Sequence, residues 1–135
     1  KIIGIVPSFL NVDGILFDNC DEMIFTETMR ERKQLMEQKS DAFIMTPGGL
    51  GTFDEFFEIM TLKQLGRHSK PIAVFNINGY FDNLIQQLKH AVHEQFMTPE
   101  FFELCLFTDN SDKLLNYIEY NVNKPEQAKV YKNIK

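Results

Sequence analysis

The chain has 135 residues, of which 44% are hydrophobic and thirteen are phenylalanine, so it carries enough apolar side chains for the packed core of one domain. Its formal net charge of −5 argues against a nucleic-acid-binding surface, which is usually basic. No apolar run reaches the length of a membrane span, and no signal peptide is visible. Cys20 and Cys105 show no CxxC or metal-binding spacing. We therefore expect a cytoplasmic protein with reduced thiols.

The first part of the chain predicts two strands and a helix. Residues 1–7 form a continuous apolar run with β-branched side chains, which is typical of a buried strand in a parallel sheet. Residues 8–22 show no period and predict a loop at the carboxyl end of that strand, where open α/β sheets bind ligands. A brief strand at residues 23–25 and a charged helix at residues 26–40 follow.

The rest of the chain alternates between apolar runs and amphipathic patterns. Strands are predicted at residues 41–45, 72–77 and 104–107, and helices at residues 52–65, 80–95 and 113–122. Gly66 is the expected C-cap of the first of these helices. Five side chains of that helix are predicted to be core: Phe53, Phe56, Phe57, Met60 and Leu65. The alternation predicts an α/β fold with a doubly wound, mostly parallel sheet and helices on both faces.

Residues 46–55, with the sequence Thr-Pro-Gly-Gly-Leu-Gly-Thr-Phe-Asp-Glu, connect a predicted strand to a predicted helix. Three glycines in four positions allow backbone conformations closed to other residues and let a ligand approach the main chain. The first N–H groups of the helix would point at that ligand, and the helix dipole favours an anion such as phosphate. The same residues also fit a purely structural turn in which Thr52 and Glu55 form a capping box.

A positive cluster, Arg30, Arg32 and Lys33, lies on the charged helix that Thr28 and Glu31 are predicted to cap. One interpretation is a solvated helix face with ion pairs between residues four apart. The other is an anion-binding face beside the glycine-rich turn.

The chain has three histidines. His90 and His93 are three residues apart on a predicted helix, a spacing that could bind a metal. The sequence offers no apparent third ligand, so we expect both to face solvent. His68 falls in a loop away from the expected ligand edge and is predicted to lie at the surface.

Two motifs together resemble the Lonely Guy (LOG) family: Pro-Gly-Gly-x-Gly-Thr-x-x-Glu at residues 47–55, preceded by Met-Arg-Glu-Arg-Lys at residues 29–33. The resemblance runs from residue 1 to about residue 120. It implies a Rossmann-like fold, a homodimer with each active site close to the subunit interface, and a phosphoribohydrolase that releases a free base from a nucleoside 5′-monophosphate such as AMP or a cytokinin nucleotide. Relatives often carry the label "lysine decarboxylase", but nothing here marks a pyridoxal-phosphate lysine.

The resemblance also implies roles for particular residues. Arg32 and Glu55 are the expected catalytic residues, and Glu55 would stabilise an oxocarbenium-like sugar by analogy with glycosidases. No metal or organic cofactor is expected. The residues expected to bind substrate or its phosphate are Lys33, Gly48, Gly49, Leu50, Gly51, Thr52 and Thr61.

The chain departs from the family at two positions. Gly14 stands where a glutamate is usual, and Arg30 stands where a histidine is usual, which affects the choice of substrate and the base pocket. Family members also have an earlier βαβ portion that helps to hold the nucleotide. We therefore expect a piece of a longer protein, with one domain over residues 1–123 and a polar tail over residues 124–135.

Two other classes of function stay open. The first is a non-catalytic nucleotide-binding or cofactor-carrier module on the same fold, as in molybdenum-cofactor carrier proteins. Binding alone would not need both Arg32 and Glu55, which favours catalysis. The second is a DNA-processing protein of related fold, which the acidic charge disfavours.

Overall fold

The computed structural model describes residues 1–12, 14, 16, 17 and 19–123, and the predicted polar tail lies outside these residues. The chain divides into two compact units, Lys1–Ser40 and Asp41–Lys135. We call them the first and the second unit and describe each by itself. The prediction of one domain over residues 1–123 stays a prediction.

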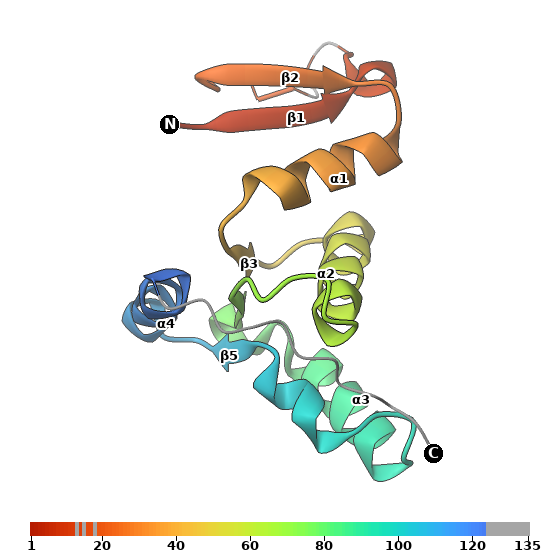
Figure 1. The fold of residues 1–135 in the computed structure, drawn as a ribbon, viewed down its shortest axis with the longest axis vertical. Helices are drawn as coiled ribbons and strands as arrows, with labels where there is room; N and C mark the ends of the chain where they lie inside the picture. Colours follow the sequence, from red (N-terminus) through yellow and green to blue (C-terminus); the bar gives the residue numbers. More distant parts are fainter. Residues whose placement is uncertain (13, 15, 18, 124–135) are drawn as a thin grey trace. The chain divides into compact units, whose positions relative to one another are not determined.

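The first unit is a parallel strand pair with one helix (Figure 1). Strand β1 (Ile3–Pro7) pairs with β2 (Glu22–Thr26) along the full length of both strands. A short 3-10 turn, η1 (Ser8–Leu10), follows β1, and helix α1 (Met29–Lys39) packs against both strands. The two predicted strands and the predicted helix of this region are therefore confirmed.

Helix α1 begins where the sequence supplies a cap. The Thr28 hydroxyl accepts the backbone N–H of Glu31 at 3.1 Å, and the Glu31 carboxylate accepts the backbone N–H of Glu27 at 2.9 Å. These bonds satisfy donors that the first turn of a helix leaves without partners. The predicted cap is thus confirmed, and the helix starts later than residue 26 because Thr26 ends β2.

The described part of the second unit contains three strands, all parallel, in the order β3-β4-β5. Its elements, in chain order, are β3 (Phe43–Met45), α2 (Leu50–Gln64), β4 (Ile72–Phe75), the 3-10 turn η2 (Ile77–Gly79), α3 (Asp82–His93), the 3-10 turn η3 (Pro99–Glu103), β5 (Leu106–Thr108) and α4 (Ser111–Asn123). Helices α2 and α3 connect successive parallel strands, as such strands require. All three strand carboxyl ends therefore meet at one edge of the sheet.

Helices cover both faces of this sheet. Ile72 and Val74 of β4 belong to a core that α2, α3 and η3 complete through residues such as Met60. Ala73, between them, points to the opposite face because side chains alternate along a strand, and α4 packs against β4 and β5 (Figure 1). The predicted α/β class with mostly parallel strands and helices on both faces is confirmed.

Helix α2 ends as predicted but buries fewer side chains than predicted. Gly66 adopts φ +68°, its N–H donates to Lys63 O at 3.0 Å, and Arg67 N–H donates to Leu62 O at 2.9 Å. This is the Schellman pattern that glycine favours. Among the five predicted core residues of the helix, Phe57 and Leu65 are exposed instead, at 39% and 54%.

The described residues contain no helix long and apolar enough to cross a membrane.

Candidate functional site at the carboxyl edge of the second sheet

The amino terminus of α2 lies directly after β3, at the carboxyl edge of the sheet. Gly49 is the N-cap, with extended backbone angles, and its carbonyl accepts the N–H groups of Thr52 at 3.1 Å and Phe53 at 3.3 Å. Within the described chain, the N–H groups of Leu50 and Gly51 donate to no backbone carbonyl, and no side chain caps Gly49. The turn therefore presents main-chain donors at the positive end of a fifteen-residue helix.

The predicted capping box of Thr52 and Glu55 is wrong. The helix already begins at Leu50, so Thr52 stands inside the first turn rather than at its cap. The reason is that the Gly49 carbonyl accepts the first helical bonds before Thr52 is reached. The side chains of Thr52 and Glu55 therefore do not form the predicted cap of α2.

Gly48 is fixed from two sides. A β-carbon at Gly48 would overlap the Thr52 hydroxyl, which packs directly against this glycine. On the other side, the Tyr80 hydroxyl donates to the Gly48 carbonyl at 2.7 Å. Close approach and this hydrogen bond together hold the turn in one conformation, which is the preorganisation that an anion site needs.

Tyr80 is a site residue that the sequence analysis missed. It follows β4 in a turn where Asn78 and Gly79 have positive φ, at 52° and 71°. The Asn76 side chain fixes this turn, because it accepts the N–H of Phe81 at 2.7 Å and donates to Asp82 at 2.8 Å. The available signal was the Asn-Gly turn signature after a strand whose carboxyl end meets the same edge.

Glu55 and Thr61 occupy different parts of α2. Glu55 is half-buried, three residues after Thr52 and so on a neighbouring part of the helix surface. Thr61 is exposed, and the helical rise places it about 16 Å along the axis from Leu50. The structure therefore brings Glu55 close to the turn but does not bring Thr61 to it.

The predicted basic residues belong to the first unit. Arg32 is half-buried, and its Nε donates to the carbonyl of Ile5 in β1 at 2.9 Å. Lys33 is also half-buried, whereas Arg30 is exposed. The bond to Ile5 fixes the stem of the Arg32 guanidinium against the strand, so its remaining N–H groups have a defined direction. Cooperation of Arg32 or Lys33 with Glu55 stays a prediction.

Two further positions have structural explanations. Gly14 has φ +81°, a conformation in which a glutamate would be strained. His68 was predicted to be a surface residue, and this prediction is wrong: only 8% of it is exposed, and its Nε2 lies 3.0 Å from the carbonyl oxygen of Ile59. Its ring also lies 5.8 Å from that of Phe43, so His68 is part of the packing between α2 and β3.

Comparison with known proteins identifies the family. A family described as "Possible lysine decarboxylase" matches residues 1–118, so the chain belongs to that family. Among curated proteins, the chain is 41% identical over 108 residues to a cytokinin riboside 5′-monophosphate phosphoribohydrolase of Mycobacterium tuberculosis, with 80% of this chain and 58% of the relative covered.

Plant relatives give the same result. The chain is 37% identical over 123 residues to the cytokinin riboside 5′-monophosphate phosphoribohydrolase LOG2 of Arabidopsis thaliana, covering 91% of this chain and 58% of the relative. It is 35% identical over 124 residues to a probable enzyme of the same name, LOGL3, from rice, Oryza sativa subsp. japonica, covering 89% and 59%. The predicted resemblance to LOG proteins is confirmed, and the chain spans somewhat more than half the length of these relatives.

Proposed function

We propose that the protein hydrolyses the N-glycosidic bond of a nucleoside 5′-monophosphate, AMP or a cytokinin riboside monophosphate, to give free base and ribose 5-phosphate. The observation that carries this proposal is the uncapped amino terminus of α2 at the glycine turn (residues 48–51), with Glu55 one turn further along the same helix. The relatives named as phosphoribohydrolases support it.

The 5′-phosphate would bind at the glycine turn. The N–H groups of Leu50 and Gly51 and the Thr52 hydroxyl are the donors, and the α2 dipole favours the negative charge. Gly48 and Gly49 allow the phosphate to approach the main chain closely. Lys33 would add positive charge from the first unit.

Glu55 would stabilise the sugar as the bond breaks. The electron pair of the bond between C1′ and the base nitrogen leaves with the base, and C1′ develops oxocarbenium character that a carboxylate stabilises. A water oxygen, oriented by Glu55, bonds to C1′, and one water proton ends on the departing base. Arg32 would orient Glu55 and the ribose.

We also propose a homodimer in the cytoplasm. Three exposed residues of α2 and its exposed C-cap are spaced for one helical stripe: Leu50, Phe57, Thr61 and Leu65. A second copy packed on this stripe would bury apolar surface and place Thr61 near a substrate at the interface, rather than at the turn of its own helix. Two free cysteines favour a reducing compartment.

The test compares AMP with adenosine as substrates of the intact protein. We expect release of adenine and ribose 5-phosphate from AMP, and little release from adenosine because the turn then binds no phosphate. Equal rates with both substrates would contradict the proposed phosphate site. Tight binding of AMP without any turnover would instead support the non-catalytic nucleotide-binding module.

A further inference from the structure

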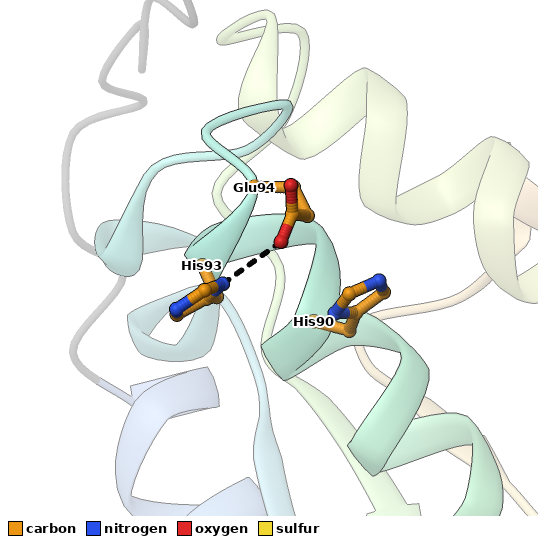
Figure 2. A group of neighbouring side chains, drawn as sticks. All are labelled: His90, His93 and Glu94. Carbon is orange, nitrogen blue, oxygen red and sulfur yellow. Dashed lines mark hydrogen bonds and ion pairs between the residues drawn. The ribbon is translucent and has the colours of Figure 1, made fainter.

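Three potential metal ligands lie together at the carboxyl end of α3, outside the candidate active site (Figure 2). His90 and His93 occupy the last turn of the helix, and Glu94 is its C-cap. One nitrogen of each histidine and one carboxylate oxygen all lie within 4.8 Å of one another. The sequence analysis found no third ligand for the histidine pair, and the fold supplies one because Glu94 turns its carboxylate toward His93.

The side chains are already close to the geometry that a metal requires. His93 Nδ1 lies 2.9 Å from Glu94 Oε1, a hydrogen bond that the imidazole N–H proton makes to the carboxylate. Two ligands of one tetrahedral zinc ion, each about 2.0–2.1 Å from the metal, lie about 3.3 Å apart. A metal could therefore replace that proton with a small separation of the two groups. The His90 ring, inclined by only 12° to the His93 ring, would complete the set by a side-chain rotation.

The backbone under these ligands is held in place. The Glu94 N–H donates to the His90 carbonyl at 2.9 Å, and the Phe96 N–H donates to the Ala91 carbonyl at 2.9 Å. Gln95, with φ +64°, gives this helix the same Schellman ending that Gly66 gives α2. Metal binding would thus cost mainly side-chain rotamer freedom, because the main chain needs no rearrangement.

We propose that His90, His93 and Glu94 form a surface site for a late first-row divalent cation, with Zn²⁺ as the representative ion. Two imidazole nitrogens and one carboxylate oxygen are a ligand set that Zn²⁺ uses in proteins, with water in the remaining position. The carbonyl end of a helix carries partial negative charge, which favours a cation there. The chain's net charge of −5 also favours cation binding.

This site is separate from the glycine turn. Helix α3 begins just after Tyr80, at the carboxyl edge of the sheet, and its rise carries His93 about 16 Å along the axis from Asp82. The ion would therefore contact neither the proposed phosphate donors nor Glu55. We expect the ion to affect only the carboxyl end of α3. The experiments below therefore measure metal binding rather than enzymatic turnover.

The first experiment titrates the tag-free, chelator-treated full chain with Zn²⁺ in a calorimeter. We expect one equivalent per chain. Loss of a residue that only hydrogen-bonds a metal ligand typically weakens metal binding by roughly 10- to 100-fold. His90→Ala and His93→Ala each remove a ligand itself, so each should weaken Zn²⁺ binding by more than this. Glu94→Gln should weaken it as well. Asn83→Ala, an exposed residue seven positions before His90 on the same helix, is the matched control and should leave binding unchanged.

The second experiment follows the three imidazoles by nuclear magnetic resonance during the same titration. We expect the signals of His90 and His93 to shift together, while buried His68 stays unchanged. Equal Zn²⁺ affinity in the parent and the His90→Ala and His93→Ala variants would overturn the proposal. Half an equivalent of Zn²⁺ with association of chains would also overturn it, because the ligands would then come from two copies.

Discussion

The two units both pair parallel strands and pack a helix against them, but they bury very different amounts of apolar surface. In the described part of Lys1–Ser40, Pro7 and Thr26 are the buried residues. Between residues 41 and 123, the second unit buries Phe81, Met60 and Ile72 almost completely, with nine other hydrophobic residues below one-tenth exposure. Parallel sheets usually have both faces covered, and an isolated strand pair is only marginally stable. From this comparison we expect stability to be concentrated in the second unit.

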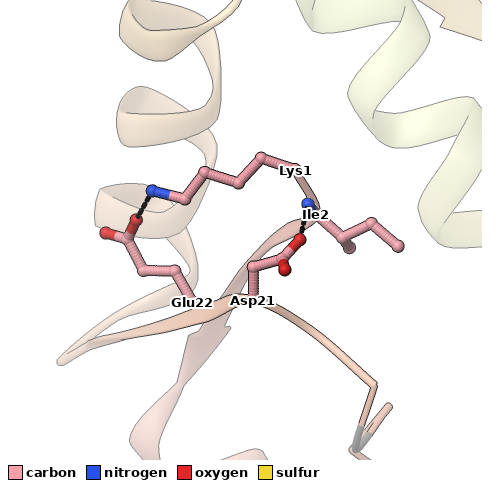
Figure 3. A network of polar contacts seen from close by, with 4 residues as sticks. All are labelled: Lys1, Ile2, Asp21 and Glu22. Atoms are coloured by element: carbon pink, nitrogen blue, oxygen red, sulfur yellow. Dashed lines mark hydrogen bonds and ion pairs between the residues drawn. The ribbon is translucent and has the colours of Figure 1, made fainter.

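Exposed polar contacts join the start of β1 to residues 21 and 22 in the first unit. The Lys1 ammonium binds the Glu22 carboxylate at 2.6 Å, and the Ile2 N–H donates to the Asp21 carboxylate at 2.5 Å (Figure 3). Such exposed contacts contribute little to the free energy of folding. The half-buried hydrogen bond from Arg32 to Ile5 gives this residue a structural role in the first unit besides its proposed catalytic role.

The largest expected loss of stability comes from truncating a core side chain of the second unit. Phe81 is 1% exposed and meets Phe53 edge to face at 6.2 Å. We expect Phe81→Ala to lower the free energy of unfolding by about 3–5 kcal/mol. Ile24→Ala in half-buried β2 should cost less than about 2 kcal/mol. Urea titrations of both variants measure these losses in the free energy of unfolding. Equal losses would contradict the expectation that stability is concentrated in the second unit.

The rates at which the two cysteines react with a thiol reagent should also differ between the units, because Cys20 lies in the first unit and Cys105 in the second. Burial raises the pKa of the Cys105 thiol to about 12, whereas Cys20 is only half-buried. At pH 8 we expect Cys105 to react with a thiol reagent on the order of 10³-fold more slowly than an ordinary cysteine, because so little thiolate is present. Labelling followed by peptide mass analysis should find Cys105 modified only after unfolding. Cys20→Ser should remove the fast phase and nothing else.

Glu55→Gln tests the proposed catalytic carboxylate. The change keeps the shape but removes the negative charge, so we expect turnover of AMP to fall on the order of 10²-fold with nucleotide affinity retained. Because glutamine keeps the size and shape of the side chain, the thermal midpoint should change little. Asp54→Asn removes the same charge from the neighbouring exposed position and should leave turnover intact.

Arg32→Ala tests the other proposed catalytic residue, which lies in the first unit. We expect a similar loss of turnover, together with weaker nucleotide binding and some loss of stability, because the bond to the Ile5 carbonyl is lost as well. Steady-state kinetics and thermal unfolding of this variant separate the two roles. Near-parental turnover in a destabilised Arg32→Ala protein would restrict Arg32 to a structural role.

A smaller effect is expected from Tyr80→Phe. The variant keeps the ring, which packs edge to face on Phe81 at 4.9 Å, but loses the hydrogen bond to the Gly48 carbonyl. We expect a stability loss of roughly 0.5–1.5 kcal/mol. We also expect a raised KM for AMP with little change in kcat, because a looser turn weakens phosphate binding. An unchanged KM would show that Gly48 needs no such support.

The smallest effect concerns pH and the exposed ion pair of the first unit. The hydrogen bond from Lys1, and then the Lys1 charge, lower the pKa of Glu22 below its ordinary value of 4.5. Since the pKa is lower in the folded than in the unfolded state, ionised Glu22 stabilises the fold above pH 4.5, and this contribution is lost as the pH falls through the folded pKa. Lys1→Gln should remove this pH dependence, as followed by hydrogen exchange of β1 and β2.

The sequence by itself determined the elements whose causes are local. The apolar runs of β1 and β4, the Thr28 cap of α1 and the glycine end of α2 at Gly66 all lie where the pattern predicted them. Local hydrogen-bonding groups and backbone freedom are sufficient for these features, because each depends on residues within a few positions. The family motif at residues 47–55 is local in the same sense.

Only the tertiary structure decided the features that join distant residues. Gly48 is held by Tyr80, thirty-two positions later, and the imidazole of His68 is buried beside Phe43 of a preceding strand. Single-sequence periodicity carries no information about either contact, because parallel strands bring their ends together only through the helices that connect them.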